Sequence, residues 1–202
     1  MRIRCLWCDG DVEKGHNIFK ILMGNVMLCG KCQKQFTVIK KEFVVDKVKG
    51  LALYEYNEFF SSVLIQYKEC FDEVLKDVFL KPFNHYISYK YRGYSLVAIP
   101  SSKQKYEERG FQHVKQIFEN VKLPWCDVLE KRSNVDQKKL SLAKRKHIEL
   151  SLIDGVKIPN KILLVDDVYT TGSTIRKAIA LLKADSRIIK VLVVAKVVEK
   201  SI

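Results

Sequence analysis

Twelve consecutive residues decide the fold of this chain: Leu163-Leu164-Val165-Asp166-Asp167-Val168-Tyr169-Thr170-Thr171-Gly172-Ser173-Thr174. The apolar start predicts a buried strand that ends in two carboxylates, and the hydroxyl-rich loop leads into an alanine- and leucine-bearing helical pattern. Unpaired N–H groups at a helix start, together with the positive end of the helix dipole, bind phosphate, and Gly172 lets the backbone come close. The stretch therefore predicts a site for a phosphorylated sugar, with hydroxyls around the phosphate from Thr170, Thr171, Ser173 and Thr174.

Two acids, Asp166 and Asp167, stand one step before this phosphate loop (residues 170–174). The carboxylates of this acid pair can accept hydrogen bonds from ribose hydroxyls or hold a cation that bridges the sugar. The alternative is an acidic strand end before a helix whose N-cap is Thr or Ser, which alone accounts for the hydroxyls. Capping needs one hydroxyl and no pair of acids, so we favour the sugar-phosphate site. No Gly-Lys-Ser/Thr follows the glycine, which excludes a Walker loop.

Strands alternate with helices along the rest of the chain. Strands are predicted at residues 51–56, 95–100, 160–166 and 188–198, and helices at residues 57–67, 72–83, 110–121 and 172–184. This alternation predicts an α/β fold in which helices cover both faces of a mostly parallel sheet. In such sheets ligands bind beyond the carboxyl ends of the strands, where Pro100-Ser101-Ser102 and the acid pair both fall.

Cysteines near the start of the chain follow the spacing C-x2-C-x20-C-x2-C: Cys5, Cys8, Cys29 and Cys32. Two such pairs, each on a hairpin, place four thiolates tetrahedrally around one Zn²⁺ and leave no open position for water, so the metal is structural. The alternatives are two disulfides or a redox Cys-x-x-Cys. A cytosolic chain keeps structural thiols reduced, and one redox pair leaves the duplication unexplained, so we predict a small zinc ribbon. We expect Cys70 and Cys126 to be buried packing residues.

The length of 202 residues suffices for one full α/β core and a small appendage. We place the boundary in the basic connection around Lys40-Lys41 and residues 47–50, which predicts a zinc ribbon with its linker at residues 1–49 and a second domain at residues 50–202. No window approaches the ~18 uninterrupted apolar residues of a membrane span, and the start lacks the apolar stretch of a signal peptide. We therefore expect a cytoplasmic protein without a membrane span.

The formal net charge of +13 and the pI near 9.4 indicate a polyanionic partner, with nucleic acid the first candidate and an anionic membrane surface the second. Between residues 131 and 148, seven basic residues stand against one acid. This segment is either a solvated face or mobile loop, or a contact for an anion. In Lys90-Tyr91-Arg92-Gly93-Tyr94, bases and rings alternate as in single-strand binders, although core packing is the alternative for each ring taken singly.

The strand, acid pair and phosphate loop resemble the phosphoribosyl-pyrophosphate (PRPP) signature of type I phosphoribosyltransferases. With the four cysteines in front, nearly the whole chain resembles the ComF family of bacterial competence proteins. Further matching segments are Ile99-Pro100 with Glu108-Arg109-Gly110-Phe111, and Gln137-x-x-Leu140-Ser141 with Arg145. The chain departs from the family at Gln112-His113, where Asn-Gln is usual, and at His147, where Asn is usual.

The resemblance implies a role in natural transformation, in which a complex with a ComFA-type helicase receives single-stranded DNA in the cytoplasm. It also implies a site for PRPP or another phosphorylated ribose, together with Mg²⁺. In this site the acid pair holds the ribose hydroxyls, and the phosphate loop with Gly172 holds the 5′-phosphate. The loop of Ser101, Ser102 and Lys103 contacts pyrophosphate, and Arg109 with residues 138–146 folds over as a cationic lid.

Two functions stay open. The first is an active phosphoribosyltransferase, which displaces pyrophosphate from C1 of PRPP by positioning the reactants and stabilising the separating charge. The second, which we favour, is a nucleic-acid binding module that keeps the fold and the PRPP site. No residue stands out as the reader of an acceptor base, so the acceptor and any catalytic residue stay unassigned. The nucleic-acid candidates are Lys90, Tyr91, Arg92, Lys138, Lys139, Lys144, Arg145 and Lys146, with Trp7, Trp125, Tyr89 and Tyr94 as further stacking candidates.

Overall fold

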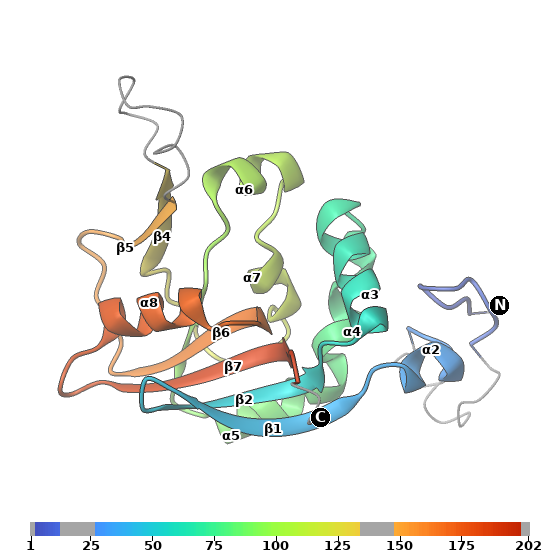
Figure 1. The fold of residues 1–202 in the computed structure, drawn as a ribbon, viewed down its shortest axis with the longest axis horizontal. Coiled ribbons are helices and arrows are strands. Elements are labelled where there is room, and N and C mark those ends of the chain that lie inside the picture. Colours follow the sequence, from blue (N-terminus) through green and yellow to red (C-terminus); the bar gives the residue numbers. More distant parts are fainter. Residues whose placement is uncertain (1–2, 13–26, 134–147, 199–202) are drawn as a thin grey trace.

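A five-stranded sheet forms the centre of the protein, with its strands in the order β1-β2-β7-β6-β3 (Figure 1). The structure, a computed structural model, describes residues 3–12, 27–133 and 148–198. The strands are β1 (Val38–Val45), β2 (Val48–Glu55), β3 (Ser95–Ala98), β6 (Lys161–Tyr169) and β7 (Ile188–Lys196). Strands β2, β7, β6 and β3 run parallel, and β1 runs antiparallel to β2. The predicted α/β fold with a mostly parallel sheet is confirmed.

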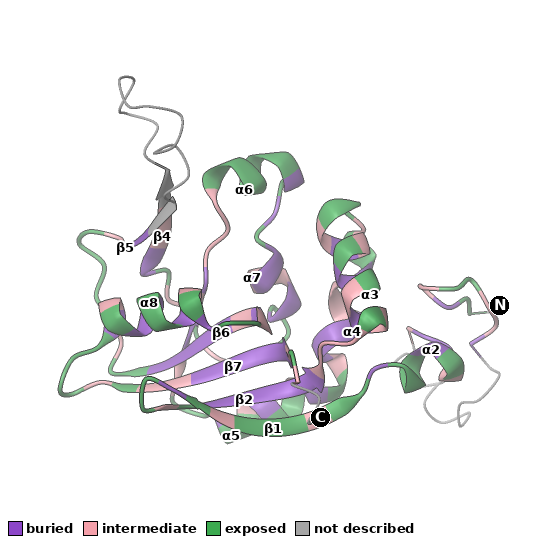
Figure 2. Ribbon diagram, viewed as in Figure 1, coloured by how far each residue is buried: buried purple, intermediate pink, exposed green. Residues whose placement is uncertain are grey.

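Helices cover both faces of the sheet, and the buried residues lie along the strands and the inward helix surfaces (Figure 2). Helix α8 (Ser173–Leu182) packs on one face. The helices that pack on the other face are α3 (Glu58–Glu69), α4 (Lys76–Leu80), α5 (Asn84–Lys90) and α7 (His113–Ile117). Side chains alternate between the faces, so that Leu163 and Val165 join one core cluster while Ile162 and Leu164 join the other. Two covered faces explain why these strands read as continuous apolar runs.

A two-stranded antiparallel sheet, β4 (Leu129–Ser133) and β5 (Ile148–Leu152), packs beside α8. Leu129 and Leu150 bury their side chains in the same core cluster as Ile179 of α8. The connection between these strands, residues 134–147, lies outside the described residues. The predicted lid and the candidates Lys138, Lys139, Lys144, Arg145 and Lys146 fall on this connection.

The basic segment predicted as a linker is instead a β-hairpin. Residues 40–50 belong to strands β1 and β2, except for the tight turn between them. In this turn Asp46 and Lys47 have φ angles of 47° and 66°. The predicted boundary between residues 49 and 50 therefore falls inside β2. Strand β1 lies at the edge of the sheet, and lysines on an edge strand discourage pairing with another chain. The same lysines made this segment read as a linker.

Two of the predicted helices are shorter than expected. Residues 72–83 form the 3₁₀ turns η1 (Glu73–Leu75) and η2 (Lys81–Phe83) on either side of α4, and Pro82 lies at the start of η2 because proline cannot continue an α-helix. In place of one helix at residues 110–121, the chain forms α6 (Lys103–Arg109) and the short α7. Gly110 separates these helices as the left-handed C-cap of α6, with φ 78°.

Both cysteines outside the N-terminal group are less buried than predicted. Cys70 is exposed and Cys126 is half-buried, so the expectation that they are buried packing residues is wrong. Among the helices that the structure describes, none combines the length and the apolar character needed to cross a membrane.

Candidate functional site

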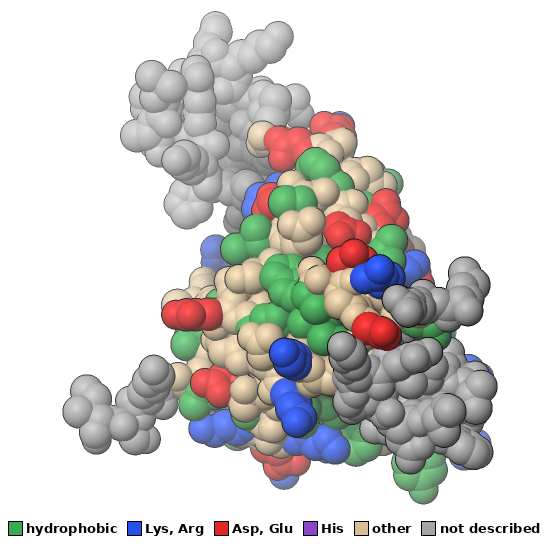
Figure 3. Space-filling model, turned by 90° about the vertical axis from the view of Figure 1, so that its right-hand side faces the viewer, with side chains coloured by type: hydrophobic (Ala, Val, Ile, Leu, Met, Phe, Trp, Pro, Cys, Tyr) green, Lys and Arg blue, Asp and Glu red, His purple; other side chains and the backbone are tan. Residues whose placement is uncertain are grey.

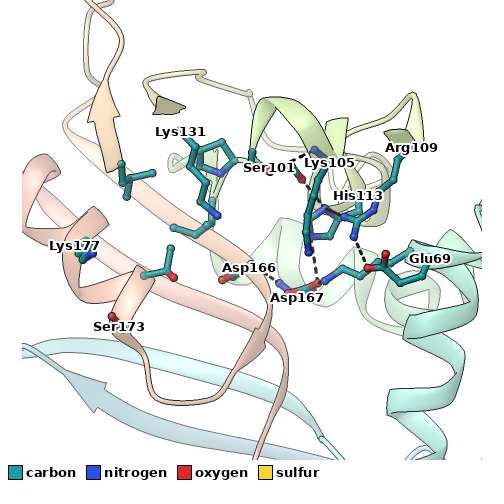
Figure 4. Close-up of a pocket in the computed structure, with 16 residues that line it drawn as sticks. Glu69, Ser101, Lys105, Arg109, His113, Lys131, Asp166, Asp167, Ser173 and Lys177 are labelled. Carbon is teal, nitrogen blue, oxygen red and sulfur yellow. Dashed lines mark hydrogen bonds and ion pairs between the residues drawn. The ribbon is translucent and has the colours of Figure 1, made fainter. Parts of the chain in front are cut away.

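A cavity of about 460 Å³ opens beyond the carboxyl ends of β3 and β6 (Figure 4). Strand β6 supplies the acid pair, the loop after β3 supplies Ser101 and Ser102, and the start of α8 supplies Ser173 and Thr174. These segments lie far apart in the sequence and meet because the carboxyl ends of parallel strands share one edge of the sheet. Titratable side chains from the surrounding elements complete the lining: Lys68, Glu69, Lys105, Arg109, His113, Lys131 and Lys177.

The phosphate loop forms a smaller recess of about 50 Å³, which shares Asp166, Ser173 and Thr174 with the cavity. Gly172 is the N-cap of α8 with a left-handed φ of 72°, and a Cβ there would lie 2.5 Å from Tyr169 Oη, so only glycine fits. Because glycine occupies the N-cap, the simple alternative of a Thr or Ser cap is not realised. Thr171 Oγ1 accepts only a long hydrogen bond of 3.4 Å from Ser173 N–H.

Asp167 is the centre of a polar network at the base of the cavity (Figure 4). Its carboxylate is buried, and its Oδ1 accepts a hydrogen bond of 2.7 Å from Val168 N–H. Its Oδ2 forms an ion pair with Lys68 Nζ of α3 and lies 3.2 Å from His113 Nε2 of α7. Both oxygens of Asp167 are therefore engaged with partners inside the protein.

His113 has one tautomer that satisfies its neighbours. Its Nδ1 lies 2.9 Å from Ser101 Oγ and 3.5 Å from Arg109 Nη1. A guanidinium only donates, so Nδ1 is the acceptor, and the ring proton of a neutral imidazole then sits on Nε2. Nε2 lies 3.2 Å from Asp167 Oδ2. The network thus links the loop after β3 to the end of β6 through one histidine ring.

The two acids of the pair differ in protonation behaviour. Burial raises the pKa of Asp166 well above its ordinary value, and the negative charge of Asp167 adds to the effect. Burial also acts to raise the pKa of Asp167, but the hydrogen bond from His113 and the Lys68 ammonium outweigh it and hold that pKa below the ordinary value. Burial lowers the pKa of His113, and it lowers the pKa of the Lys131 ammonium too. Asp167 is therefore ionised beside a neutral His113 at pH 7.

Most residues predicted to bind PRPP meet at this cavity and its recess. The acid pair, Ser101, Ser102, Arg109, Ser173 and Thr174 line the cavity, while Thr170, Thr171 and Gly172 line the recess. Lys103 lies outside both linings: it is exposed on α6, and its ammonium is 3.8 Å from Glu107. Arg109 was expected in a lid, but it is buried in the cavity wall, where it forms an ion pair with Glu69 at 2.5 Å.

Several cavity residues were missed by the sequence reasoning. Lys68 carries no motif, since it is one lysine on the amphipathic helix α3. Lys105 and Lys177 are likewise single lysines on helices, and no motif marks them. His113 stood out only as a departure from the usual Asn-Gln. Lys131 was counted in the basic segment without a site being assigned to it. Only the packing of α3, α6 and β4 around the strand ends reveals these side chains.

The four N-terminal cysteines come together, as predicted. Their sulfur atoms all lie within 4.8 Å of one another, and Cys8 Sγ is 3.6 Å from Cys29 Sγ. Four thiolates at a Zn–S distance of about 2.3 Å place their sulfurs about 3.8 Å apart, so the cluster fits a metal ion. The first pair lies in the turn between the bridged residues Arg4 and Asp11, but the second pair lies at the start of α2 (Gly30–Lys34) and not on a hairpin.

The acid pair does not offer a comparable metal site. Among the described residues, the cysteine cluster is the one place where three or more His, Cys, Asp or Glu side chains could hold an ion together. The Asp167 carboxylate is already engaged by Lys68 and His113, and Asp166 Oδ1 accepts the Asp167 N–H at 3.0 Å. Within the described part of the chain, the expected Mg²⁺ would therefore depend on the phosphates of a ligand and not on a preformed set of protein ligands.

The aromatic candidates for nucleic-acid binding divide into buried and exposed rings. Tyr91 is buried, which corrects the expectation of an exposed stacking ring at this position. Trp7 packs edge-on against Phe59, with the two ring centres 5.5 Å apart, and Trp125 packs against the core. Tyr89 is 85% exposed on α5 beside the exposed Lys90. A stacking platform on this surface would therefore use Tyr89.

The molecular face that carries α3 has a different character (Figure 3). Hydrophobic side chains gather at its centre with acidic side chains beside them, and on α3 and the turn that follows the exposed residues include Ile65, Phe71, Glu69 and Glu73. Acidic groups repel a phosphate backbone, so this face is a poor surface for nucleic acid.

Comparison with known proteins matches residues 107–200 to the phosphoribosyl transferase domain family. The chain is 36% identical over 138 residues to the competence protein ComFC of Streptococcus pneumoniae, which covers 67% of this chain and 62% of that protein. It is 28% identical over 159 residues to the competence protein ComFC of Bacillus subtilis, which covers 75% of this chain and 64% of that protein. The chain thus spans less than two thirds of the length of these curated relatives.

Two solved phosphoribosyltransferase structures are also similar at low identity. A hypoxanthine phosphoribosyltransferase from Staphylococcus aureus is 17% identical, with a TM-score of 0.35. The match covers 60% of this chain and 61% of that enzyme's chain. The orotate phosphoribosyltransferase from Aeropyrum pernix is 15% identical, with a TM-score of 0.32. The match covers 81% of this chain and 76% of that enzyme's chain. The sequence matches confirm the predicted resemblance to the ComF family, and this chain is a relative of its ComFC competence proteins that carries a phosphoribosyl transferase domain.

Proposed function

We propose that this protein takes part in natural transformation in the cytoplasm, where it handles incoming single-stranded DNA together with a ComFA-type helicase. We further propose that its cavity binds PRPP or another phosphorylated ribose, and that its cysteine cluster holds one structural Zn²⁺. Similarity to the two ComFC competence proteins supports the role in transformation. Two matched Cys-x-x-Cys pairs support zinc, which four thiolates bind without an open position.

One observation carries the proposed ligand: a phosphate loop and a group of cations border the same cavity. Lys68, Lys105, Arg109, Lys131 and Lys177 line it with three carboxylates, those of Glu69 and the acid pair. The cations outnumber the acids, so an anion of more than one charge is favoured over a neutral sugar. Ordered hydroxyls at the start of α8 suit a monoester phosphate, which the helix dipole also favours.

Each part of a phosphorylated ribose has a place in this arrangement. The 5′-phosphate would bind at residues 170–174. Asp166 accepts the Asp167 N–H at its Oδ1 and would accept a ribose hydroxyl at its Oδ2. A diphosphate would reach Ser101, Lys105 and Lys131 across the cavity. Lys131 is half-buried, so less water competes with a phosphate oxygen for its ammonium than for the exposed ammonium of Lys105.

Single-stranded DNA would bind a basic and aromatic surface outside the cavity. On α5 and the turn after it, Lys90 and Arg92 are exposed beside the open ring of Tyr89. Lys40 of β1 reaches the same surface, with its ammonium 5.2 Å from the centre of the Tyr86 ring. Bases stack on exposed rings while lysine and arginine contact the backbone phosphates. The basic residues 138–146 supply further candidates.

The alternative function is an active phosphoribosyltransferase that transfers ribose 5-phosphate from PRPP to an unknown acceptor. The favouring observation is that Ser101 and the phosphate loop border one cavity, where they could hold the two ends of PRPP. Among the residues that the structure describes, the cavity lining includes no Phe, Tyr or Trp ring on which an acceptor base could stack, so we place this function second.

Fluorescence polarisation of a labelled single-stranded oligonucleotide, titrated with zinc-loaded protein at several salt concentrations, tests the proposal. We expect binding that weakens steeply with salt and is reduced in Tyr89→Ala and in the pair Lys90→Gln/Arg92→Gln. The charge-matched control is Lys157→Gln/Lys183→Gln, two exposed lysines on the side of the sheet that carries α8, which should bind as wild type does. Absence of binding at low salt contradicts the DNA role of the isolated protein.

PRPP added as a competitor separates the two sites. Displacement of DNA by PRPP would put DNA phosphate in the phosphate loop, whereas unchanged binding would leave the α5 surface and the cavity as separate sites. Binding of PRPP itself is followed by calorimetry, and release of pyrophosphate on addition of candidate bases would establish the transferase alternative.

A further inference from the structure

A lysine side chain of the protein already provides the positive charge next to the acid pair. Lys68 Nζ forms its ion pair with Asp167 Oδ2, and the Lys68 side chain is only 19% exposed. His113 Nε2 lies 3.2 Å from the same oxygen, and Val168 N–H donates a hydrogen bond of 2.7 Å to Oδ1. A divalent cation that approached Asp167 Oδ2 would compete with the Lys68 ammonium and the His113 ring for the same oxygen.

The position of Lys68 is set by rigid structure around it. The preceding residue, Tyr67, is fully buried, and its hydroxyl donates to the backbone oxygen of His113 at 3.0 Å and lies 3.1 Å from Gln116 Oε1. Helices α3 and α7 are thereby tied together next to Asp167. The following residue, Glu69, holds Arg109 in the cavity wall. The residues on either side of Lys68 thus make contacts with other elements, which hold this end of α3 next to Asp167.

We propose that Lys68 is a resident counter-ion that keeps divalent cations off the acid pair, so that the cavity binds a phosphorylated ribose without a metal ion coordinated by the protein. The second half of this statement rests on the proposed ligand, and the first half does not. An ammonium neutralises a carboxylate as a metal does but offers no open coordination position. Asp166 is then the carboxylate left for a sugar hydroxyl, and the lining lysines meet the phosphate charge directly.

Binding of Mn²⁺ to the zinc-loaded full chain tests the first half, with free Mn²⁺ followed by its electron paramagnetic resonance signal. The wild type should show no saturable site. Lys68→Met should gain one Mn²⁺ per chain, because the Asp167 carboxylate loses its ion pair and becomes available as a ligand. Lys68→Met/Asp167→Asn should lose this Mn²⁺ again, because the ligand is removed. Lys76→Met is the matched control, since it removes a lysine from an ion pair with Glu119 outside the cavity; it should behave as wild type.

Two results overturn the inference. One is a wild-type Mn²⁺ site that disappears in Asp167→Asn, a comparison that needs no Lys68 variant and stands even if Lys68→Met fails to fold. The other is a folded Lys68→Met protein that gains no Mn²⁺ site, because metal exclusion would then not depend on Lys68. Lys68→Arg keeps the positive charge and should exclude Mn²⁺ like the wild type.

Calorimetry with ribose 5-phosphate tests the second half. This probe has no diphosphate to carry its own metal, so any effect of Mg²⁺ reports on the protein. The dissociation constant of the wild type should be the same in EDTA and in Mg²⁺, whereas Lys68→Met should bind weakly in EDTA and regain affinity in Mg²⁺. A wild type that binds only with Mg²⁺ contradicts the inference. If ribose 5-phosphate fails to bind while the Mn²⁺ pattern holds, the proposed ligand is wrong and the role of Lys68 is supported.

Discussion

At the scale of single residues, the site depends on one neutral histidine between an acid and a serine. The neutral ring of His113 keeps an acceptor at Nδ1, which faces Ser101 Oγ at 2.9 Å and Arg109 Nη1 at 3.5 Å, while its Nε2 lies 3.2 Å from Asp167 Oδ2. Protonation would turn Nδ1 into a donor that faces the Arg109 guanidinium. Burial keeps it uncharged by lowering its pKa. The ring therefore orders two sides of the cavity without bringing a charge of its own.

The lowered pKa of His113 predicts a loss of stability in mild acid. The unfolded chain takes up a proton near the ordinary histidine pKa of about 6.5, before the folded chain does, so a falling pH favours unfolding. His113→Gln lacks this proton uptake and should show a flatter dependence of the free energy of unfolding between roughly pH 7 and pH 5.

Urea unfolding of both proteins across that range checks the prediction. The raised pKa of Asp166 acts in the opposite direction, because there the folded state takes up the proton first, so the difference between wild type and variant is the informative quantity. Parallel curves for the two proteins would mean that His113 titrates equally in the folded and unfolded chains.

Gly172 permits a second prediction at this scale. Gly172→Ala should lower the free energy of unfolding by more than Gly155→Ala, although both glycines have φ near 70°, at 72° and 75°. A left-handed alanine costs roughly 1–2 kcal/mol by itself. At Gly172 the new Cβ would also meet the Tyr169 ring, whereas at Gly155 no atom lies within 4 Å. Urea titration measures both, and equal losses would contradict the contact with Tyr169.

At the scale of elements, α3 joins the cysteine module to the cavity. Asn57 caps the helix as predicted, because its Oδ1 accepts from Phe60 N–H at 2.8 Å. Its Nδ2 donates to Gln35 O at 2.9 Å, just after α2. Lys68 and Glu69 lie at the other end of the helix, where they reach Asp167 and Arg109. One helix thus spans from the cysteines to the acid pair.

Replacing the helix cap separates these two contacts. Asn57→Ala loses both and should cost about 1–2 kcal/mol in the free energy of unfolding. Asn57→Asp keeps a capping oxygen but loses the amide donor to Gln35 O, so its loss should be smaller. Chemical denaturation ranks the variants. If Asn57→Asp is as destabilised as Asn57→Ala, the contact with Gln35 matters more than the cap.

At the scale of the whole molecule, the cysteine module shares its core with the sheet. Cys5, Cys29 and Cys32 belong to the same buried cluster as Phe36, whose ring lies 5.2 Å from the Phe59 ring and 5.4 Å from the Tyr54 ring. A change at the cysteine cluster is therefore transmitted by direct packing to β2 and α3.

Removal of two thiolates tests this coupling. Cys5→Ser/Cys8→Ser should lose the one bound zinc ion and unfold at a lower temperature throughout the chain, because metal binding energy is folding energy in such modules. Cys70→Ser, an exposed cysteine outside the cluster, should keep both zinc and thermal stability. Metal analysis together with a thermal unfolding scan checks the outcome. A double variant with full zinc content would refute a four-thiolate site.

The sequence by itself determined the α/β class, the four-cysteine group and the phosphate loop of this protein. Each of these depends on neighbours in the chain: apolar periodicity over one strand, paired cysteines, and hydroxyls beside one glycine. The β1–β2 hairpin escaped prediction because an edge strand carries the lysines that also mark a linker.

Only the tertiary structure decided how the acid pair is neutralised. Lys68, His113 and Asp167 come from three elements, and no local pattern marks them as partners. His113 stands 45 positions after Lys68, and Asp167 stands 54 positions after His113. Their ionic state depends on burial and on distances of a few ångströms, which exist only after α3 and α7 pack over the end of β6. The sequence predicts a site for a phosphorylated sugar, and the packing of two helices determines how each of the two carboxylates in that predicted site is neutralised.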